Sequence, residues 1–149
     1  MRKVLIVVGY QEEKLQFIGK KRQKLEDWIV ANQGDYDYTI SIVRDAGNRN
    51  MRKSGTEIIN SDTKNYYPFS VEEEIIVTGY DIDTSIFDIN TEYHIVGVST
   101  GASVLCIAMS MYSEGLNVRV LENYCFDRMG LHKEAIKLMS AYMKDCVLK

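Results

Sequence analysis

The 149-residue sequence predicts a three-layer α/β/α fold, in which helices cover both faces of a mainly parallel, Rossmann-like sheet of five or six strands. Short segments made almost wholly of Val, Ile and Leu recur along the chain, as in strands that are buried on both faces. Segments of helical periodicity separate several of them, which is the order of a parallel sheet with crossover helices. The length suits one core, so we expect residues 1–149 to form a single domain.

The first half of the chain contains three expected strands and one long helix. Residues 4–8 are apolar on both faces and predict the first strand. Apolar side chains at helical spacing predict a helix over 11–32. Residues 38–43 and 75–77 predict the second and third strands. Between them, residues 44–70 are polar and contain the only proline, which predicts a long loop.

The second half continues the alternation with two strands and two helices. Residues 93–98 predict a fourth strand, and a helix is expected from about 103 to 114, before a glycine suited to its C-terminus. Residues 117–121 predict the fifth strand. The last helix is expected over about 131–146, where apolar residues again recur at helical spacing.

Composition excludes several classes of protein. The net charge of −3 argues against a nucleic-acid binder, and no apolar run is long enough to span a bilayer. Three cysteines without a CxxC pair predict reduced thiols in a cytoplasmic protein. With only two histidines, a zinc site is not expected. We therefore expect no metal, no cofactor and no membrane partner.

The end of the fourth strand is the most informative place for function. Ser99, Thr100 and the two small residues after them lead directly into a helix whose first turn holds Ser103. In parallel sheets ligands bind beyond the carboxyl ends of the strands, and free N–H groups at a helix start attract anions. The alternative is that these hydroxyl residues only cap the helix.

The same segment carries a family resemblance. Residues 97–124 read GVSTGASVLCIAMSMYSEGLNVRVLENY, which resembles the isochorismatase-like superfamily of nicotinamidases and other amidohydrolases with a cysteine nucleophile. Six positions fall in the register of that pattern: Gly97, Thr100, Val104, Ala108, Gly115 and Val118. The resemblance implies the isochorismatase-like hydrolase fold over most of the chain.

The resemblance also implies a catalytic triad, and this chain departs from it at all three positions. The family's Asp, Lys and Cys correspond to Gly9, Thr78 and Ser103. Cys106 lies almost one helical turn further on, so we expect a buried thiol that does not replace the nucleophile. The family's metal-binding Asp matches Asp45, but the partner histidine is absent, which gives no support for a metal.

These observations favour a domain that keeps the fold and the pocket but has lost cysteine-hydrolase activity. It would bind, sequester or sense a small amide, carboxylate or nucleotide-like molecule. The expected ligand-binding residues are Ser99, Thr100, Ser103, Thr78 and Tyr10.

Two alternatives stay open. The first is a hydrolase of C–N bonds in small amides, acting through Ser103 or a rearranged site. A serine needs a base within reach, and His94 is expected at the far end of the sheet, so Asp45, Asp81 or Asp83 would have to supply it. The second alternative is a structural or interaction module that acts as a homo-oligomer.

Two further features bear on partners. Only ten positions separate Phe87 from Gly97, where the family has a helix, so one crossover helix is expected to be shortened. The sheet face left uncovered would be covered by the 44–70 loop or by a second copy of the chain. In that loop, Arg44 and the cations that follow it form a basic cluster that contacts either a phosphate-bearing ligand or only solvent.

Overall fold

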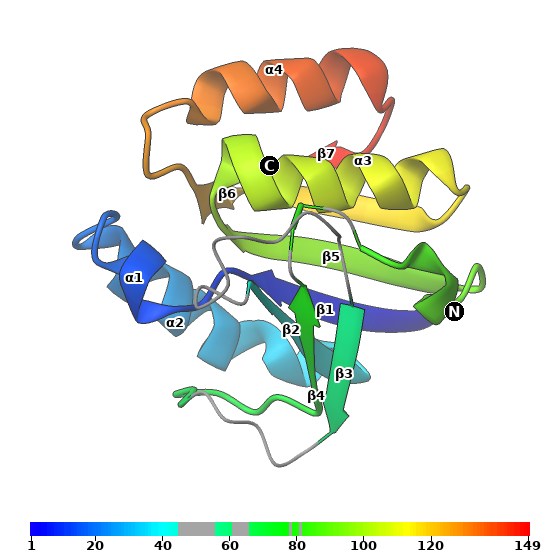
Figure 1. The fold of residues 1–149 in the computed structure, drawn as a ribbon, viewed down its shortest axis with the longest axis horizontal. Coiled ribbons are helices and arrows are strands. Elements are labelled where there is room, and N and C mark those ends of the chain that lie inside the picture. Colours follow the sequence, from blue (N-terminus) through cyan, green and yellow to red (C-terminus); the bar gives the residue numbers. More distant parts are fainter. Residues whose placement is uncertain (45–55, 61–65, 78, 81) are drawn as a thin grey trace.

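The computed structural model describes residues 1–44, 56–60, 66–77, 79–80 and 82–149. Within these residues the strands form one sheet in the order β3-β4-β2-β1-β5-β6-β7, shown in Figure 1. The strands are β1 (Arg2–Val8), β2 (Tyr38–Arg44), β3 (Thr56–Asn60), β4 (Glu73–Val77), β5 (Thr91–Val98), β6 (Asn117–Phe126) and β7 (Val147–Leu148). Neighbouring strands are parallel except at the edge, where β3 is antiparallel to β4. The expected mainly parallel sheet is confirmed.

The helices form a layer on each face of this sheet. They are α1 (Glu12–Leu15), α2 (Lys21–Asn32), α3 (Leu105–Ser113) and α4 (His132–Tyr142), with short helical turns η1 (Gln33–Asp35), η2 (Thr84–Ile86) and η3 (Thr100–Val104, a π-helix). Alternate residues of a strand point to opposite faces. In β1, Ile6 packs into the cluster that contains α3 and α4, whereas Leu5 and Val7 pack with α1 and α2. Figure 1 shows α3 and α4 side by side, away from α1 and α2. The three-layer α/β/α architecture is therefore confirmed.

The expected helix over 11–32 is wrong in its continuity. The chain forms α1, turns, and begins again as α2. Gly19, at the break, has a φ of +56°, which is left-handed backbone that interrupts a right-handed helix. The interruption lets α1 lie as a separate turn beyond the end of β1.

Three other boundaries differ from expectation. Residues 56–60, expected to be part of a loop, form β3 at the sheet edge. The strand expected to end at 121 continues to Phe126, after a register shift between Ile95 and Gly97 of the neighbouring β5. The last helix ends at Tyr142, because the chain turns back to pair β7 with the middle of β6.

The shortened crossover agrees with the structure. In the described residues between β4 and β5, the only helical segment is the three-residue η2. Beside it, the apolar side chains of Ile82 and Phe87 pack into the core under the sheet.

None of the helices in the described residues is both long and apolar enough to cross a membrane.

The order of the strands places a crevice at the centre of the sheet. From β1 the chain proceeds through β2 to β4 on one side, and then returns to β5 on the other side of β1. Ligands of open α/β sheets bind outside the carboxyl ends of the strands at such a switch point. Here those ends are Val8–Gly9 and Val98–Ser99, and the Val98–Ser99 peptide bond is cis.

Candidate functional site

A small cavity of about 30 Å³ lies at this switch point. A bound water needs about 10–15 Å³ of such space, so the cavity suits a group of only a few heavy atoms. Its lining residues come from five separate segments: Lys14, Arg44, Tyr80, Ser99, Ala102, Ser103 and Arg128. The cavity therefore contains Ser103, which stands at the nucleophile position of the family pattern.

Each polar group of the cavity is placed by a different part of the fold. Ser99 follows β5, and Ser103 lies in η3, which is continuous with α3. Arg44 ends β2, and Gln11 holds it there: the Gln11 amide donates to the Arg44 carbonyl at 2.8 Å and accepts from its N–H at 2.9 Å. Arg128 follows β6, and its backbone N–H donates to the Ser99 hydroxyl at 3.4 Å.

Lys14 is the most unusual residue of the cavity. It lies on α1 and is only 8% exposed, although lysine is rarely buried without a partner. The pKa of its ammonium group is lowered to about 8, mainly by burial and then by the nearby Arg44 and Arg128, while Glu13 acts in the opposite direction. The side chain is therefore held in an environment that disfavours its own charge.

The three cations of the cavity have no counter-charge in the part of the chain that the structure describes. The ion pairs found there involve Arg22 and His94, and none involves Lys14, Arg44 or Arg128. Instead, the Arg44 guanidinium lies 4.3 Å from the centre of the Tyr80 ring, as a cation–π contact. The described lining thus carries three cationic side chains and no carboxylate, in a chain whose net charge is −3.

Backbone donors at the start of the helix are mostly occupied, which corrects the expectation of free N–H groups there. The Gly101 N–H donates to the Asp127 carboxylate at 2.8 Å. The N–H groups of Ala102 and Val104 both donate to the Ser99 carbonyl at 3.1 Å. An anion in this cavity would be bound mainly by side-chain cations and hydroxyl groups.

Tyr10 and Thr100 do not join the cavity, although both were expected in the pocket. The Tyr10 ring is buried against Tyr67 and Phe69, and its hydroxyl donates to Glu26, which raises the pKa of Tyr10 together with burial. Thr100 is fully buried, and its hydroxyl pairs with Nδ1 of His132 at 2.8 Å. Of the expected residues that the structure describes, Ser99 and Ser103 are the two that line the cavity together.

The remaining candidates divide into two groups. Thr78, Asp45 and Asp81 lie outside the described residues, as does most of the 44–70 loop. Asp83 is exposed, and its carboxylate accepts from the backbone and hydroxyl of Ser85, so it does not line the cavity as a base for Ser103. His94 lies in the amino-terminal half of β5, away from the cavity, and its Nδ1 pairs with the Tyr36 hydroxyl at 2.8 Å.

Gly9, at the position of the family's acid, has no space for a side chain. Its φ is +67°, and a Cβ atom built there would lie 2.0 Å from the Val98 carbonyl oxygen. The same atom would lie 3.3 Å from Cδ of Lys14. A lysine stem therefore passes beside the place where the family has a carboxylate.

The cysteines offer no alternative nucleophile in the cavity. None of the three cysteines forms a disulfide. Cys106 is partly exposed rather than buried as expected, and it does not line the cavity. Cys125 is buried, which raises the pKa of its thiol to about 12, and Cys146 is buried as well.

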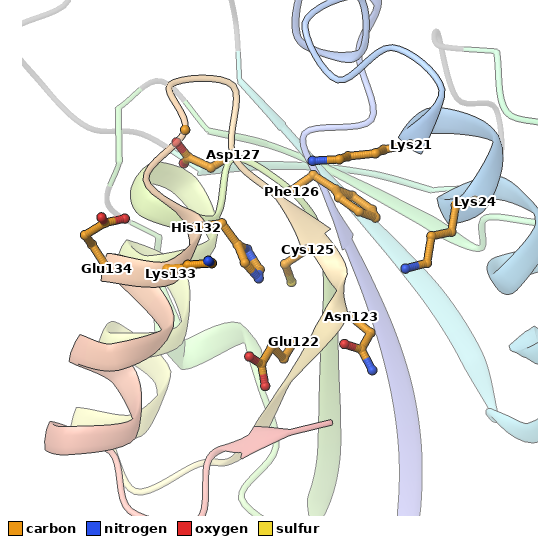
Figure 2. Close-up of a pocket in the computed structure, with 11 residues that line it drawn as sticks. Lys21, Lys24, Glu122, Asn123, Cys125, Phe126, Asp127, His132, Lys133 and Glu134 are labelled. Carbon is orange, nitrogen blue, oxygen red and sulfur yellow. The ribbon is translucent and has the colours of Figure 1, made fainter.

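A larger cleft of about 580 Å³ lies between α2, β6 and the start of α4 (Figure 2). Figure 2 shows Lys21 and Lys24 on one wall, His132 and Lys133 on the other, and Cys125 between them. The charged side chains of the lining balance, with three lysines against Glu122, Asp127 and Glu134. The cleft has the size of a ligand site but lacks the charge bias of the small cavity.

Asp127 links the two regions and yields a test of the local structure. Its carboxylate accepts from the N–H groups of Gly101 at 2.8 Å, Met129 at 3.0 Å and Leu131 at 2.9 Å. We expect Asp127→Ala to lower the free energy of unfolding by about 2 kcal/mol, because three backbone donors lose their acceptor. Asp127→Asn keeps one acceptor oxygen and should lose less in urea unfolding. Equal stability of the two variants would contradict this role.

Sequence reasoning missed Lys14 and Arg128 as site residues. Lys14 fell within the single helix expected over 11–32, and the glycine that separates α1 from α2 was the available signal. Arg128 lies beyond a strand that was expected to end seven residues earlier. In both cases an incorrectly predicted element boundary meant that the residue was not expected near the end of a strand, where the cavity lies.

Comparisons with known proteins agree on the fold. No protein-family model and no curated protein matches the chain. Among solved structures, the nicotinamidase of Staphylococcus aureus is 22% identical with a TM-score of 0.66, covering 99% of this chain and 97% of that one. The nicotinamidase/pyrazinamidase of Bacillus subtilis is 18% identical with a TM-score of 0.69, and each chain is covered fully.

A third similar structure is an isochorismatase-like hydrolase from Alkaliphilus metalliredigens, which is 13% identical with a TM-score of 0.64 and covers 100% of this chain and 95% of that one. These identities show the fold alone. They agree with the arrangement described above, in which helices flank a parallel sheet and the cavity lies at its switch point. The chain has the isochorismatase-like fold.

Proposed function

We propose that this protein binds a small anionic molecule through its carboxylate or phosphate group at the Ser103 cavity, and does not hydrolyse C–N bonds. One observation carries the proposal: Lys14, Arg44 and Arg128 line the same small cavity without an ion pair among the described residues. Such a cluster repels itself and destabilises the free protein. A bound anion removes that repulsion and is the ligand class that this cavity favours.

The chemistry of the lining narrows the expected ligand. Guanidinium groups bind carboxylate and phosphate oxygens with two parallel hydrogen bonds, and Ser99 and Ser103 add hydroxyl donors. A neutral amide would add no negative charge to the three cations, which have no counter-charge among the described residues. We therefore favour the carboxylate or nucleotide-like ligands of the sequence-based hypothesis over the amide.

Three observations argue against hydrolysis of the nicotinamidase type. Among the described residues, the lining of the cavity includes neither a carboxylate nor a histidine to act as the base for Ser103. Gly9 has no room for the acid in this backbone. Three backbone donors at the helix start, the N–H groups of Gly101, Ala102 and Val104, are already occupied by Asp127 and the Ser99 carbonyl, which leaves fewer donors for a tetrahedral oxyanion.

Thermal unfolding with added anions tests the proposal. Phosphate and acetate should each be compared with chloride at the same ionic strength, so that general screening is held constant. At a ligand concentration ten times Kd, we expect a stabilisation of about 1.4 kcal/mol, or a rise in Tm of about 3–6 °C. Arg128→Met and Arg44→Met should each weaken binding about tenfold or more, because each removes a charge-assisted contact.

The larger cleft supplies the matched control. Lys24→Met removes an exposed cation from that cleft and should leave the response unchanged. An equal loss for Lys24→Met and Arg128→Met would show that binding is nonspecific or lies in the cleft. Release of ammonia from nicotinamide, abolished by Ser103→Ala, would overturn the binding role in favour of a hydrolase.

Self-association stays a prediction, and one surface favours the interaction-module alternative. Three apolar side chains along α4 are about half exposed or more. They are Leu131, just before the helix, Leu138 within it and Tyr142 at its end. Exposed apolar side chains that gather on one element are typical of a contact surface. A module of that kind would show no response to phosphate or acetate, so the experiment above separates the two functions.

A further inference from the structure

The backbone of Lys14 is held in place by the hydrogen bonds of α1. The N–H groups of Lys14 and Leu15 donate to the Gln11 carbonyl at 2.9 and 2.8 Å, which closes the turn of α1. Arg22 of α2 binds both carboxylate oxygens of Glu12 at 2.9 and 2.7 Å and ties α1 to the longer helix. The stem of Lys14 then passes beside Gly9, where a side chain is absent.

The charged groups around the Lys14 amine favour its neutral form. Arg44 and Arg128 repel a proton on the amine, Glu13 attracts one, and burial adds a desolvation cost. Together they hold the pKa of Lys14 at about 8, so a substantial neutral fraction exists near physiological pH. A neutral amine beside other cations is the form of lysine that attacks carbonyl carbons.

The cavity also defines which carbonyl compound can reach this amine. Its volume of about 30 Å³ suits a group of only a few heavy atoms, and its two arginines attract a carboxylate. Ser99 and Ser103 line the same cavity and can donate hydrogen bonds to a carbonyl oxygen. These features describe a short molecule in which a carbonyl group lies next to a carboxylate.

We propose that Lys14 forms a Schiff base with a small 2-oxo acid whose carboxylate is bound by Arg44 and Arg128. This inference rests on the proposed function, because the anion site must first bring the ligand to the amine. It adds a reversible covalent step and a substrate class to that site.

The step balances without an oxidant or a reductant. The lone pair of Nζ forms a bond to the carbonyl carbon, and the carbonyl oxygen gains the proton that nitrogen loses. The C–O bond of this carbinolamine then breaks, and the oxygen leaves as water with a second proton. The product is a protonated imine, so an ammonium ion and a carbonyl compound give an iminium ion and water.

Reductive trapping tests the proposal. The full chain is incubated with glyoxylate or pyruvate and sodium cyanoborohydride, and the modified peptides are identified by mass spectrometry. We expect one adduct per chain on Lys14, formed about tenfold faster at pH 7 than at pH 6 and levelling off above pH 8. Arg128→Met should lower the yield at limiting acid, and phosphate should compete with the acid.

Two controls keep the result interpretable. Lys14→Met should abolish the specific adduct, whereas Lys24→Met in the exposed cleft should leave it unchanged. Labelling spread over exposed lysines, with no preference for Lys14, would overturn the Schiff base. Phosphate-dependent stabilisation without any adduct would also overturn it while leaving the anion site intact. Absence of both responses would overturn the two proposals together.

Discussion

Replacement of Lys14 by methionine should stabilise the protein and abolish its response to anions at the same time. The native lysine is 8% exposed and has no ion pair among the described residues, so its buried charge lowers the free energy of unfolding. The pKa falls from 10.5 to about 8 on folding, which corresponds to a cost of about 3 kcal/mol at neutral pH. Methionine has a similar shape and no charge, so Lys14→Met should regain most of that free energy of unfolding.

The stabilisation expected for Lys14→Met should depend on pH. Below pH 8 Lys14 is protonated in both states, and the full cost of the buried charge is present. Between pH 8 and 10.5 the folded protein has lost the proton while the unfolded chain still binds it, so stability rises with pH. The difference between Lys14→Met and the native protein should therefore shrink over this window.

Urea unfolding at pH 7 and pH 9.5, with and without phosphate, measures both effects. Lys20→Met is the matched control, because Lys20 is exposed and should change stability by less than about 0.5 kcal/mol. A loss of stability in Lys14→Met at pH 7 without phosphate would show that the ammonium has a stabilising partner. That outcome would remove the main argument for an anion site.

The sequence predicted the fold well because buried parallel strands have a strong and local signature. The apolar runs of β1, β2 and β5 are sufficient to predict these strands from the sequence. The apolar stripe of α3 likewise predicts that helix. The edge strands β3 and β7 carry weaker signals, since each is short and its pairing depends on a distant partner. Tertiary pairing, and not local preference, decides these two elements.

Prediction of the site was less complete for a related reason. Ser99 and Ser103 were found because they lie on one continuous segment at a strand end. The cations of the cavity come from α1, the end of β2 and the turn after β6, which no local pattern connects. Tyr10 was expected to line the pocket, but its ring packs against Tyr67 and Phe69 instead and does not line the cavity.

Gly9 should prove the least tolerant position near the site. Its φ of +67° disfavours any side chain, and a Cβ atom would lie 2.0 Å from the Val98 carbonyl oxygen. We expect Gly9→Ala to lower the free energy of unfolding by about 3 kcal/mol or more, as backbone strain and overlap add. Gly19→Ala isolates the strain, because Gly19 has a φ of +56° and no atom within 4 Å of its Cβ position, and should cost about 1 kcal/mol.

The difference between these two variants decides whether the hydrolase triad could be rebuilt. If Gly9→Ala costs clearly more in urea unfolding, the ends of β1 and β5 approach too closely for an acid at position 9. Restoring Asp there together with Cys at position 103 would then disrupt the cavity instead of activating it. If the two variants cost the same, the backbone beside Val98 can yield. An acid at position 9 would then fit the backbone, and this chain would differ from the family's triad only in the side chains at positions 9, 78 and 103.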